Sequence, residues 1–150
     1  MTNTERLNIY EVDPGATKAV LGLESYVRSG SLTPGLLDLI KIRASQLNGC
    51  AFCLDMHNRD AADRGESAQR LYVLSGWREA PQLFTERERA ALAFTEAVTL
   101  IDRGGVPDDV WQAASGCFDD GELVQLLMAV ATINVWNRLA VATHQHIPEQ

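Results

Sequence analysis

Two cysteines and a histidine lie close together in the segment "NGCAFCLDMH", residues 48 to 57. The whole chain of 150 residues has only three cysteines and three histidines, so this group is its strongest chemical signal. Cys50 and Cys53 are three residues apart, and His57 follows Cys53 by four. Thiols and an imidazole at this spacing can bind a metal ion or carry out redox chemistry.

The position of the two cysteines favours redox chemistry. An unperturbed thiol has a pKa of about 8.5 and is mostly protonated at neutral pH. If Gly49 separates two helices, Cys50 and Cys53 lie in the first turn of the second helix, where free N–H groups and the helix dipole favour a thiolate. His57, one turn after Cys53, can take or relay the thiol proton. Cys50 can then attack an oxidised Cys53 and form a disulfide.

Two other interpretations of the motif carry less weight. A structural zinc site needs a fourth ligand, and the candidates Cys117, His144 and His146 are scattered rather than paired. The cysteines could instead be small apolar core residues, as free cysteines often are. Cys117, which has no neighbour of this kind, is predicted to be such a core residue.

The composition sets limits on the class of protein. A chain of 150 residues suits one domain and buries roughly 70% of its unfolded surface without metal or disulfide staples. The net charge of −7 argues against nucleic acid or an anionic membrane as a partner. The first residues are polar, with no apolar signal segment, so we expect a cytoplasmic protein, in which a structural disulfide is rare.

Helix signals recur along the chain, and strand signals are sparse. The segment "GWREAPQLF" is expected to be a connector, and "DRGGVPDD" to end a helix that carries Ala90, Phe94, Ala97 and Ile101 on one side. We predict one all-α domain over residues 1–150, with no internal repeat or linker. Its expected helices cover residues 14–29, 34–48, 50–64, 67–75, about 85–101, 107–117 and, after an N-cap at Asp119 or Asp120, a final helix containing residues 126–142.

The final helix is apolar nearly all round, interrupted by Thr132, Asn134, Asn137 and Arg138. These polar side chains argue against a membrane span and for a helix packed in the centre of a bundle or against another subunit. Because buried amides need partners, the group formed by Asn134, Trp136, Asn137 and Arg138 is expected to fix helix packing or a subunit interface rather than to act in catalysis.

The sequence resembles the alkylhydroperoxidase D-like members of the carboxymuconolactone decarboxylase superfamily. The resemblance covers "LLDLIKIRASQLNGCAFCLDMHNRDA", "LFTERERAALAFTEAVTLI" and "ELVQLLMAVATINVWNRLAVAT". It implies a single-domain helical bundle of six to eight helices with peroxidase activity. In the family, the second cysteine is the nucleophile, and the first is the resolving thiol that forms a disulfide with it once it is oxidised. The resemblance gives these roles to Cys53 and Cys50. The family histidine corresponds to His57 and relays a proton to an upstream carboxylate, which is Asp38 here.

The chain departs from the family pattern at two positions. The upstream carboxylate is usually glutamate, and Asp38 is one methylene shorter. The best-known members also have a histidine before the second cysteine, where this chain has Phe52. Helical spacing independently places Asp38, Ile42 and Gln46 in one row that leads to the motif. Alternatively, Asp38 is a solvated charge near a helix start and Gln46 a surface residue.

The expected function is therefore reduction of a small peroxide by Cys53, followed by formation of a disulfide with Cys50. A dithiol or protein reductant would restore the thiols, with no metal or other cofactor. The resemblance also implies a homo-oligomer, a trimer or hexamer. Two other functions stay open: a redox-sensing or interaction module with little turnover, and a decarboxylase of the lactone-processing branch, which works without the cysteine pair.

Overall fold

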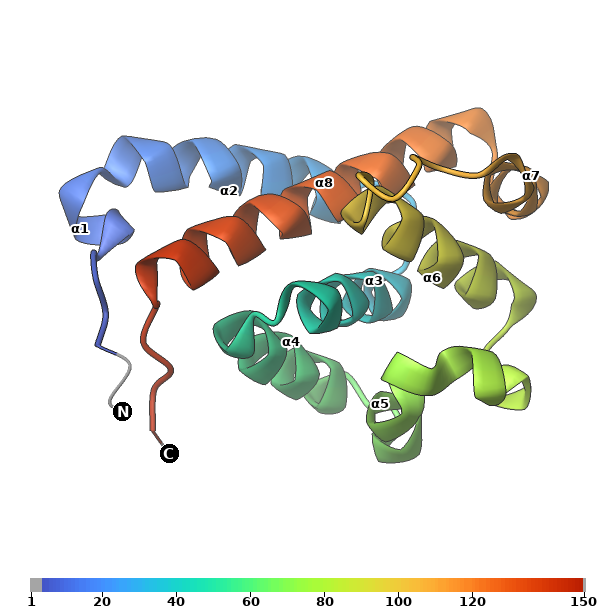
Figure 1. The fold of residues 1–150 in the computed structure, drawn as a ribbon, viewed down its shortest axis with the longest axis horizontal. Coiled ribbons are helices and arrows are strands. Elements are labelled where there is room, and N and C mark those ends of the chain that lie inside the picture. Colours follow the sequence, from blue (N-terminus) through green and yellow to red (C-terminus); the bar gives the residue numbers. More distant parts are fainter. Residues whose placement is uncertain (1–3, 150) are drawn as a thin grey trace.

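The computed structural model describes residues 4–149, and this part of the chain is all-α, as predicted (Figure 1). It contains eight α-helices, two short 3-10 helices and no strand within those residues. The helices are α1 (Ile9–Val12), α2 (Pro14–Ser29), α3 (Pro34–Asn48), α4 (Ala51–Asp63), α5 (Ala68–Val73), η1 (Leu74–Glu79), η2 (Pro81–Leu83), α6 (Glu86–Thr99), α7 (Asp108–Cys117) and α8 (Asp120–Thr143).

Helix starts follow the capping signals in the sequence. The Asp13 carboxylate accepts hydrogen bonds from the first N–H groups of α2. Thr85 and Glu88 form the expected capping box at the start of α6, and Asp119 caps α8 in a second box with Glu122. These contacts satisfy backbone donors that have no partner inside the helix, which is why they define helix starts.

Three details differ from the sequence prediction. The single turn α1, capped by Asn8, is too short to give a periodic pattern. The expected connector contains η1 and η2, because burial of Leu74 and Trp77 holds this segment against the core. Helix α6 ends at Thr99, so Ile101 lies in the following turn and is 60% exposed, instead of extending the apolar side of the helix.

Helix α3 lies in the middle of the bundle and packs against α4, α6 and α8, while α2 runs beside α8 (Figure 1). The main core lies between these helices and includes Ile40, Phe94, Leu126 and Val130. Helix α8 is long and apolar enough to cross a membrane by length and composition alone. Four of its buried side chains, Leu123, Leu126, Ala129 and Val130, belong to the main core, so α8 is a core helix of the bundle, as the sequence predicted.

A separate small cluster surrounds the cysteine motif. Cys50, Cys53 and Ala140 are buried together, with Phe52 and Trp136 packed around them. This cluster joins the start of α4 to the last third of α8. The motif therefore lies at the junction of α3, α4 and α8, inside the bundle rather than on a loop.

Candidate active site

A one-residue turn positions the motif. Gly49 ends α3 in the left-handed region, with φ 64°, which glycine adopts without a steric penalty. The Gly49 and Cys50 N–H groups donate to the carbonyls of Gln46 and Ser45, at N···O distances of 3.3 and 3.0 Å. This closes the last turn of α3, and α4 starts at once with Cys50 as its N-cap. The predicted helix boundary at Gly49 is confirmed.

The two thiols lie across the first turn of α4. The Cys53 N–H donates to the Cys50 sulfur, with an N···S distance of 3.4 Å. Cys50 takes the place that a serine or aspartate usually has at an N-cap, where negative charge is stabilised. The side chains are 1% and 2% exposed, and both cysteines are free thiols. Reagents can therefore reach the sulfurs only through cavities.

The thiols titrate as a pair. A hydrogen bond from the Cys53 thiol lowers the pKa of Cys50 to about 7, although burial opposes this. The same interaction, together with burial, raises the pKa of Cys53. The Asn137 amide lowers the pKa of both. At pH 7 the pair is therefore about half ionised, and the negative charge lies mainly on Cys50, with Cys53 as its hydrogen-bond donor.

The amides of α8 fix the helix that precedes the motif. The Asn48 side-chain N–H donates to Asn134 and Asn137, both at 2.9 Å, and Asn137 donates to the Ser45 hydroxyl at 3.0 Å. Asn137 is fully buried, so these bonds satisfy polar groups that water cannot reach. This confirms the expected role in helix packing for Asn134 and Asn137.

His57 is buried one turn after Cys53. Its Nδ1 lies 4.0 Å from an Asp60 carboxylate oxygen, while its Nε2 is buried and has no hydrogen-bond partner. Burial, with a smaller contribution from the charge of Lys41, lowers the pKa of His57 to about 4, and Asp60 opposes this only in part. The imidazole is therefore neutral at pH 7, with one nitrogen free to exchange a proton.

Asp38 does not contact His57. It is 2% exposed, and both of its oxygens accept hydrogen bonds from Arg64, at 2.8 and 2.5 Å. It is thus neither a solvated charge nor a direct acceptor from the imidazole. Gln46, from the same helical row, accepts from Arg43 at 3.0 Å instead of reaching the motif. Within 4.0 Å of the His57 ring, the carboxylate that the structure supplies is Asp60.

Sequence reasoning missed a buried ion pair beside the site. Glu24 of α2 accepts hydrogen bonds from Lys41 of α3, from Arg28 at 3.0 Å and from Trp136 at 3.3 Å. Burial raises the pKa of Glu24, but the hydrogen bonds and charges of Lys41 and Arg28 lower it overall. Lys41 was the available signal, because it is a lysine in the middle of the apolar part of α3.

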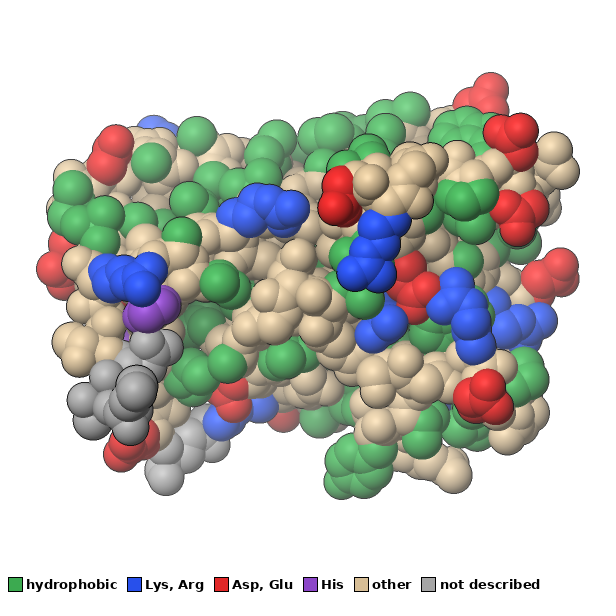
Figure 2. All heavy atoms as spheres, viewed as in Figure 1, with side chains coloured by type: hydrophobic (Ala, Val, Ile, Leu, Met, Phe, Trp, Pro, Cys, Tyr) green, Lys and Arg blue, Asp and Glu red, His purple; other side chains and the backbone are tan. Residues whose placement is uncertain are grey.

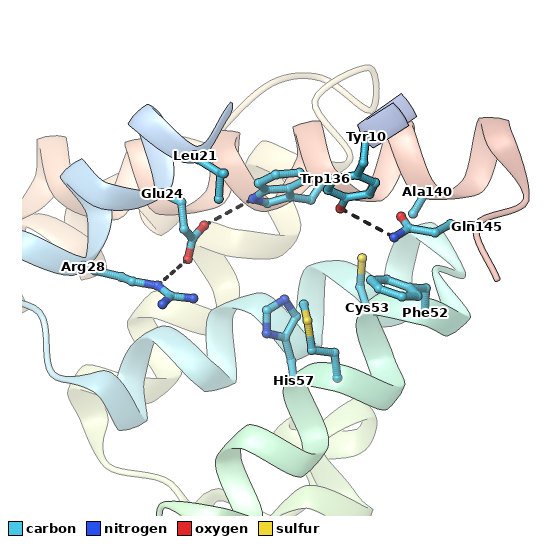
Figure 3. Close-up of a pocket in the computed structure, with 11 residues that line it drawn as sticks. Tyr10, Leu21, Glu24, Arg28, Phe52, Cys53, His57, Trp136, Ala140 and Gln145 are labelled. Carbon is cyan, nitrogen blue, oxygen red and sulfur yellow. Dashed lines mark hydrogen bonds and ion pairs between the residues drawn. The ribbon is translucent and has the colours of Figure 1, made fainter. Parts of the chain in front are cut away.

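Cys53 and His57 face a cavity of about 200 Å³ between α2, α4 and α8. Figure 3 shows Glu24 and Trp136 projecting into it from one side and His57 and Cys53 from the other. Its wall is mainly apolar, with Tyr10, Leu21, Phe52, Met56 and Trp136. Cys50 does not line this cavity. A small, largely apolar molecule placed here would meet the Cys53 sulfur and the imidazole together.

The remaining candidate ligands lie apart from this cavity. Cys117 is partly buried against the main core. Between residues 4 and 149, no three side chains of histidine, cysteine, aspartate or glutamate come together as a potential metal site.

Known proteins with similar sequence or structure match most of the chain. The carboxymuconolactone decarboxylase family matches residues 14–97. The uncharacterized protein YdfG of Bacillus subtilis (strain 168) is 39% identical over 139 residues, which are 93% of this chain and 94% of that protein. A crystal structure of an Agrobacterium tumefaciens protein of unknown function, described as a candidate antioxidant defence protein AhpD, is 43% identical. It has a TM-score of 0.95 and covers 98% of this chain and 100% of that one.

A more distant structure shares the fold. An uncharacterized peroxidase-related protein from Silicibacter sp. TM1040 is 20% identical, with a TM-score of 0.79, and the match covers 91% of this chain and 72% of that one.

Proposed function

Because the chain belongs to the carboxymuconolactone decarboxylase family and has an AhpD-like fold, we propose that it is a thiol-dependent peroxidase that reduces a small organic hydroperoxide or hydrogen peroxide. Cys53 is the attacking thiol and Cys50 the resolving thiol. The proposal depends above all on one observation: Cys53 and His57, whose Nε2 has no hydrogen-bond partner, line one mainly apolar cavity, and Cys50 contacts Cys53 from outside it. A cysteine pair in this position favours thiol chemistry over lactone decarboxylation.

The reaction needs only these groups and the peroxide. The Cys53 sulfur attacks the terminal peroxide oxygen, which carries the hydrogen, and the O–O bond breaks. The products are a Cys53 sulfenic acid and an alkoxide or hydroxide. The proton of Cys53 passes to that leaving group, which departs as alcohol or water. The Cys50 thiolate then attacks the Cys53 sulfur, a disulfide forms, and hydroxide leaves and is protonated. The peroxide gains two electrons, and the two thiols lose them.

The sulfur that carries the negative charge is not the sulfur that a peroxide in the cavity can reach. The thiolate at neutral pH lies mainly on Cys50, whereas the cavity presents Cys53. Attack by Cys53 is consistent with this, because its proton can pass to the neutral His57 as the sulfur reacts, which leaves the charge on Cys50 in place. The Cys50 thiolate is then ready for the second step.

The proton path differs from the family pattern. We assign His57 as the relay between Cys53 and the leaving group, with Asp60 as the carboxylate that stabilises the transient imidazolium from 4.0 Å. Asp38, which Arg64 holds, acts on His57 through its charge at longer range and has a smaller effect than Asp60. We therefore propose that Asp38 is a positioning residue rather than the direct proton acceptor.

The decisive experiment measures both turnover and the oxidised atom. Turnover of wild type, Cys53→Ser and Cys50→Ser is measured with cumene hydroperoxide and dithiothreitol. In a separate mixture without dithiothreitol, sulfenic acid is trapped with dimedone and located by mass spectrometry. We expect turnover only in wild type and the trapped sulfenic acid on Cys53 in Cys50→Ser. Undiminished turnover in Cys53→Ser would refute the assignment. Disulfide formation with negligible turnover would instead support the redox-sensing alternative.

The physiological setting is part of the proposal. A dithiol or a protein with a thiol pair supplies the electrons, and the reaction takes place in the cytoplasm.

We also propose a homo-oligomer, a trimer or hexamer, because Tyr26, Trp111, Val124 and Leu127 are exposed apolar side chains on α2, α7 and α8. Figure 2 shows hydrophobic side chains along the edge where α2 and α8 lie. Light scattering coupled to size exclusion measures the state, and a monomer at micromolar concentration would refute this part.

A further inference from the structure

We propose that the reductant does not enter through the peroxide cavity but reaches the disulfide through a second pocket, where its thiolate attacks Cys50. This inference rests on the proposed function and assigns a site for one of the two substrates. The second pocket has a volume of about 240 Å³ and lies between the start of α4 and the end of α8. Cys50 and Ala51 line it from one side, and Val141, His144 and Gln145 from the other.

Each of the two pockets is lined by a different cysteine of the pair. Cys53 lines the first pocket and not the second, whereas Cys50 lines the second and not the first. Phe52, Ala140 and Gln145 line both, so they form the wall that separates them. Because each sulfur is almost completely buried, these pockets determine which sulfur a reagent meets. A peroxide in the first pocket meets Cys53, and a thiolate in the second meets Cys50.

The polar groups of the second pocket suit a thiolate. Its wall includes the first turn of α4, where backbone N–H groups and the positive end of the helix dipole stabilise negative charge. The His144 imidazole and the Gln145 amide add hydrogen-bond donors. The first pocket is lined instead mainly by apolar side chains such as Leu21, Met56 and Trp136, and its Arg28 cation is already paired with Glu24.

The exchange balances in two steps. A thiolate of the dithiol attacks the Cys50 sulfur, a mixed disulfide forms, and the bond to Cys53 breaks, leaving its electron pair on Cys53, which takes up a proton. The second thiolate of the dithiol then attacks its own sulfur in the mixed disulfide, and Cys50 leaves as a thiolate. The dithiol is oxidised to a disulfide, and the protein pair is reduced. In this second step Cys50 is the leaving group, and its low pKa favours its departure.

Separate entrances have a kinetic consequence. The alcohol formed from the peroxide does not have to leave the first pocket before the reductant binds. A bulky alcohol product therefore should not compete with the dithiol.

Two matched substitutions test the route. Of these two pockets, Val141 lines the second and not the first, and Leu21 lines the first and not the second. Both side chains are exposed, at 43% and 54%. Val141→Trp and Leu21→Trp therefore narrow one entrance each without disturbing the core, which circular dichroism and thermal melting verify. The disulfide form is prepared with diamide, so that no peroxide is involved. Reduction by dithiothreitol is then followed by acid quench and mass spectrometry.

We expect the second-order rate constant for reduction to fall by roughly tenfold or more in Val141→Trp and to stay near wild type in Leu21→Trp. Oxidation of the reduced protein by cumene hydroperoxide should show the reverse pattern. Equal rates of reduction in wild type and Val141→Trp, or slower reduction in Leu21→Trp alone, would overturn the inference. A protein that peroxide does not oxidise would refute the proposed peroxidase function, while the diamide experiment would still decide the entry route.

The attacked sulfur is identified by a second measurement. Single-cysteine forms are made as mixed disulfides with thionitrobenzoate, at Cys50 in Cys53→Ser and at Cys53 in Cys50→Ser, each with Cys117→Ser. Release of the coloured thiolate by dithiothreitol should be faster from Cys50, and Val141→Trp should slow only that reaction. Faster release from Cys53 would contradict attack at Cys50.

Discussion

The hydrogen bond between the two thiols can be tested by its effect on the pKa of Cys50. Donation from Cys53 is the largest cause that lowers this pKa to about 7. Cys53→Ala removes the donor, while burial of Cys50, which favours the neutral thiol, remains. We therefore expect the pKa of Cys50 to return to about 9 or above. This change corresponds to roughly 3 kcal/mol less stabilisation of the thiolate.

The consequence at pH 7 is large enough to measure in two ways. The thiolate fraction of Cys50 should fall from about one half to about one per cent, and its alkylation by iodoacetamide should slow roughly fiftyfold. Absorbance of the thiolate at 240 nm, titrated against pH, gives the pKa directly. Both measurements use a Cys117→Ser background, because Cys117 is also a free thiol.

A matched control separates the donor from the size of the side chain. Cys53→Ser keeps a hydroxyl that can donate to the Cys50 sulfur, so its pKa should stay closer to 7 than in Cys53→Ala. If Cys53→Ala leaves the pKa of Cys50 near 7, the thiol pair does not carry the stabilisation. The backbone N–H of residue 53, which also lowers this pKa, and the start of α4 would then be its main source.

Two further predictions concern charges buried around the site. His57 has a pKa of about 4 in the folded protein against an ordinary 6.5, so folding favours its neutral form and this stability is lost as the pH falls through that interval. Urea denaturation should show that the free energy of unfolding falls by about 2 kcal/mol between pH 7 and pH 5 because of this group. An equal fall in His57→Gln would contradict the assignment to His57. Glu24→Gln leaves Lys41 buried beside a neutral amide and should cost roughly 3 kcal/mol of unfolding free energy or more. Glu24→Gln combined with Lys41→Met should recover most of that loss in the same assay, and a double variant as unstable as the single one would argue against the ion pair.

Much of the fold could be predicted because its signals are local. Capping residues such as Asp13 and Thr85 satisfy N–H groups within three residues of themselves, so they mark helix starts without any tertiary contact. Gly49 ends α3 for a similar reason, since its backbone conformation is strained for other residues. The sequence prediction missed α1, which is a single helical turn, and the 3-10 segment that Trp77 holds against the core. Neither segment gives a periodic pattern of apolar residues.

The sequence by itself determined the reacting group. The spacing of Cys50, Cys53 and His57 on one helix places the sulfurs within one turn and the imidazole one turn further, because the geometry of an α-helix repeats every 3.6 residues. The Gly49 boundary then places both thiols at the end of the helix that favours negative charge. These features depend on neighbours along the chain and hold in any packing of the bundle.

Only the tertiary structure decided what surrounds that group. Helical spacing placed Asp38 on the side of the motif, but Arg64, which lies 26 residues away in the sequence, binds its carboxylate. Glu24 meets Trp136 across 112 residues because α2 packs along α8. The electrostatics of the site and the division of the two sulfurs between two pockets arise from these contacts between helices. The period of a single helix does not specify them, because they depend on how the buried faces of different helices fit together.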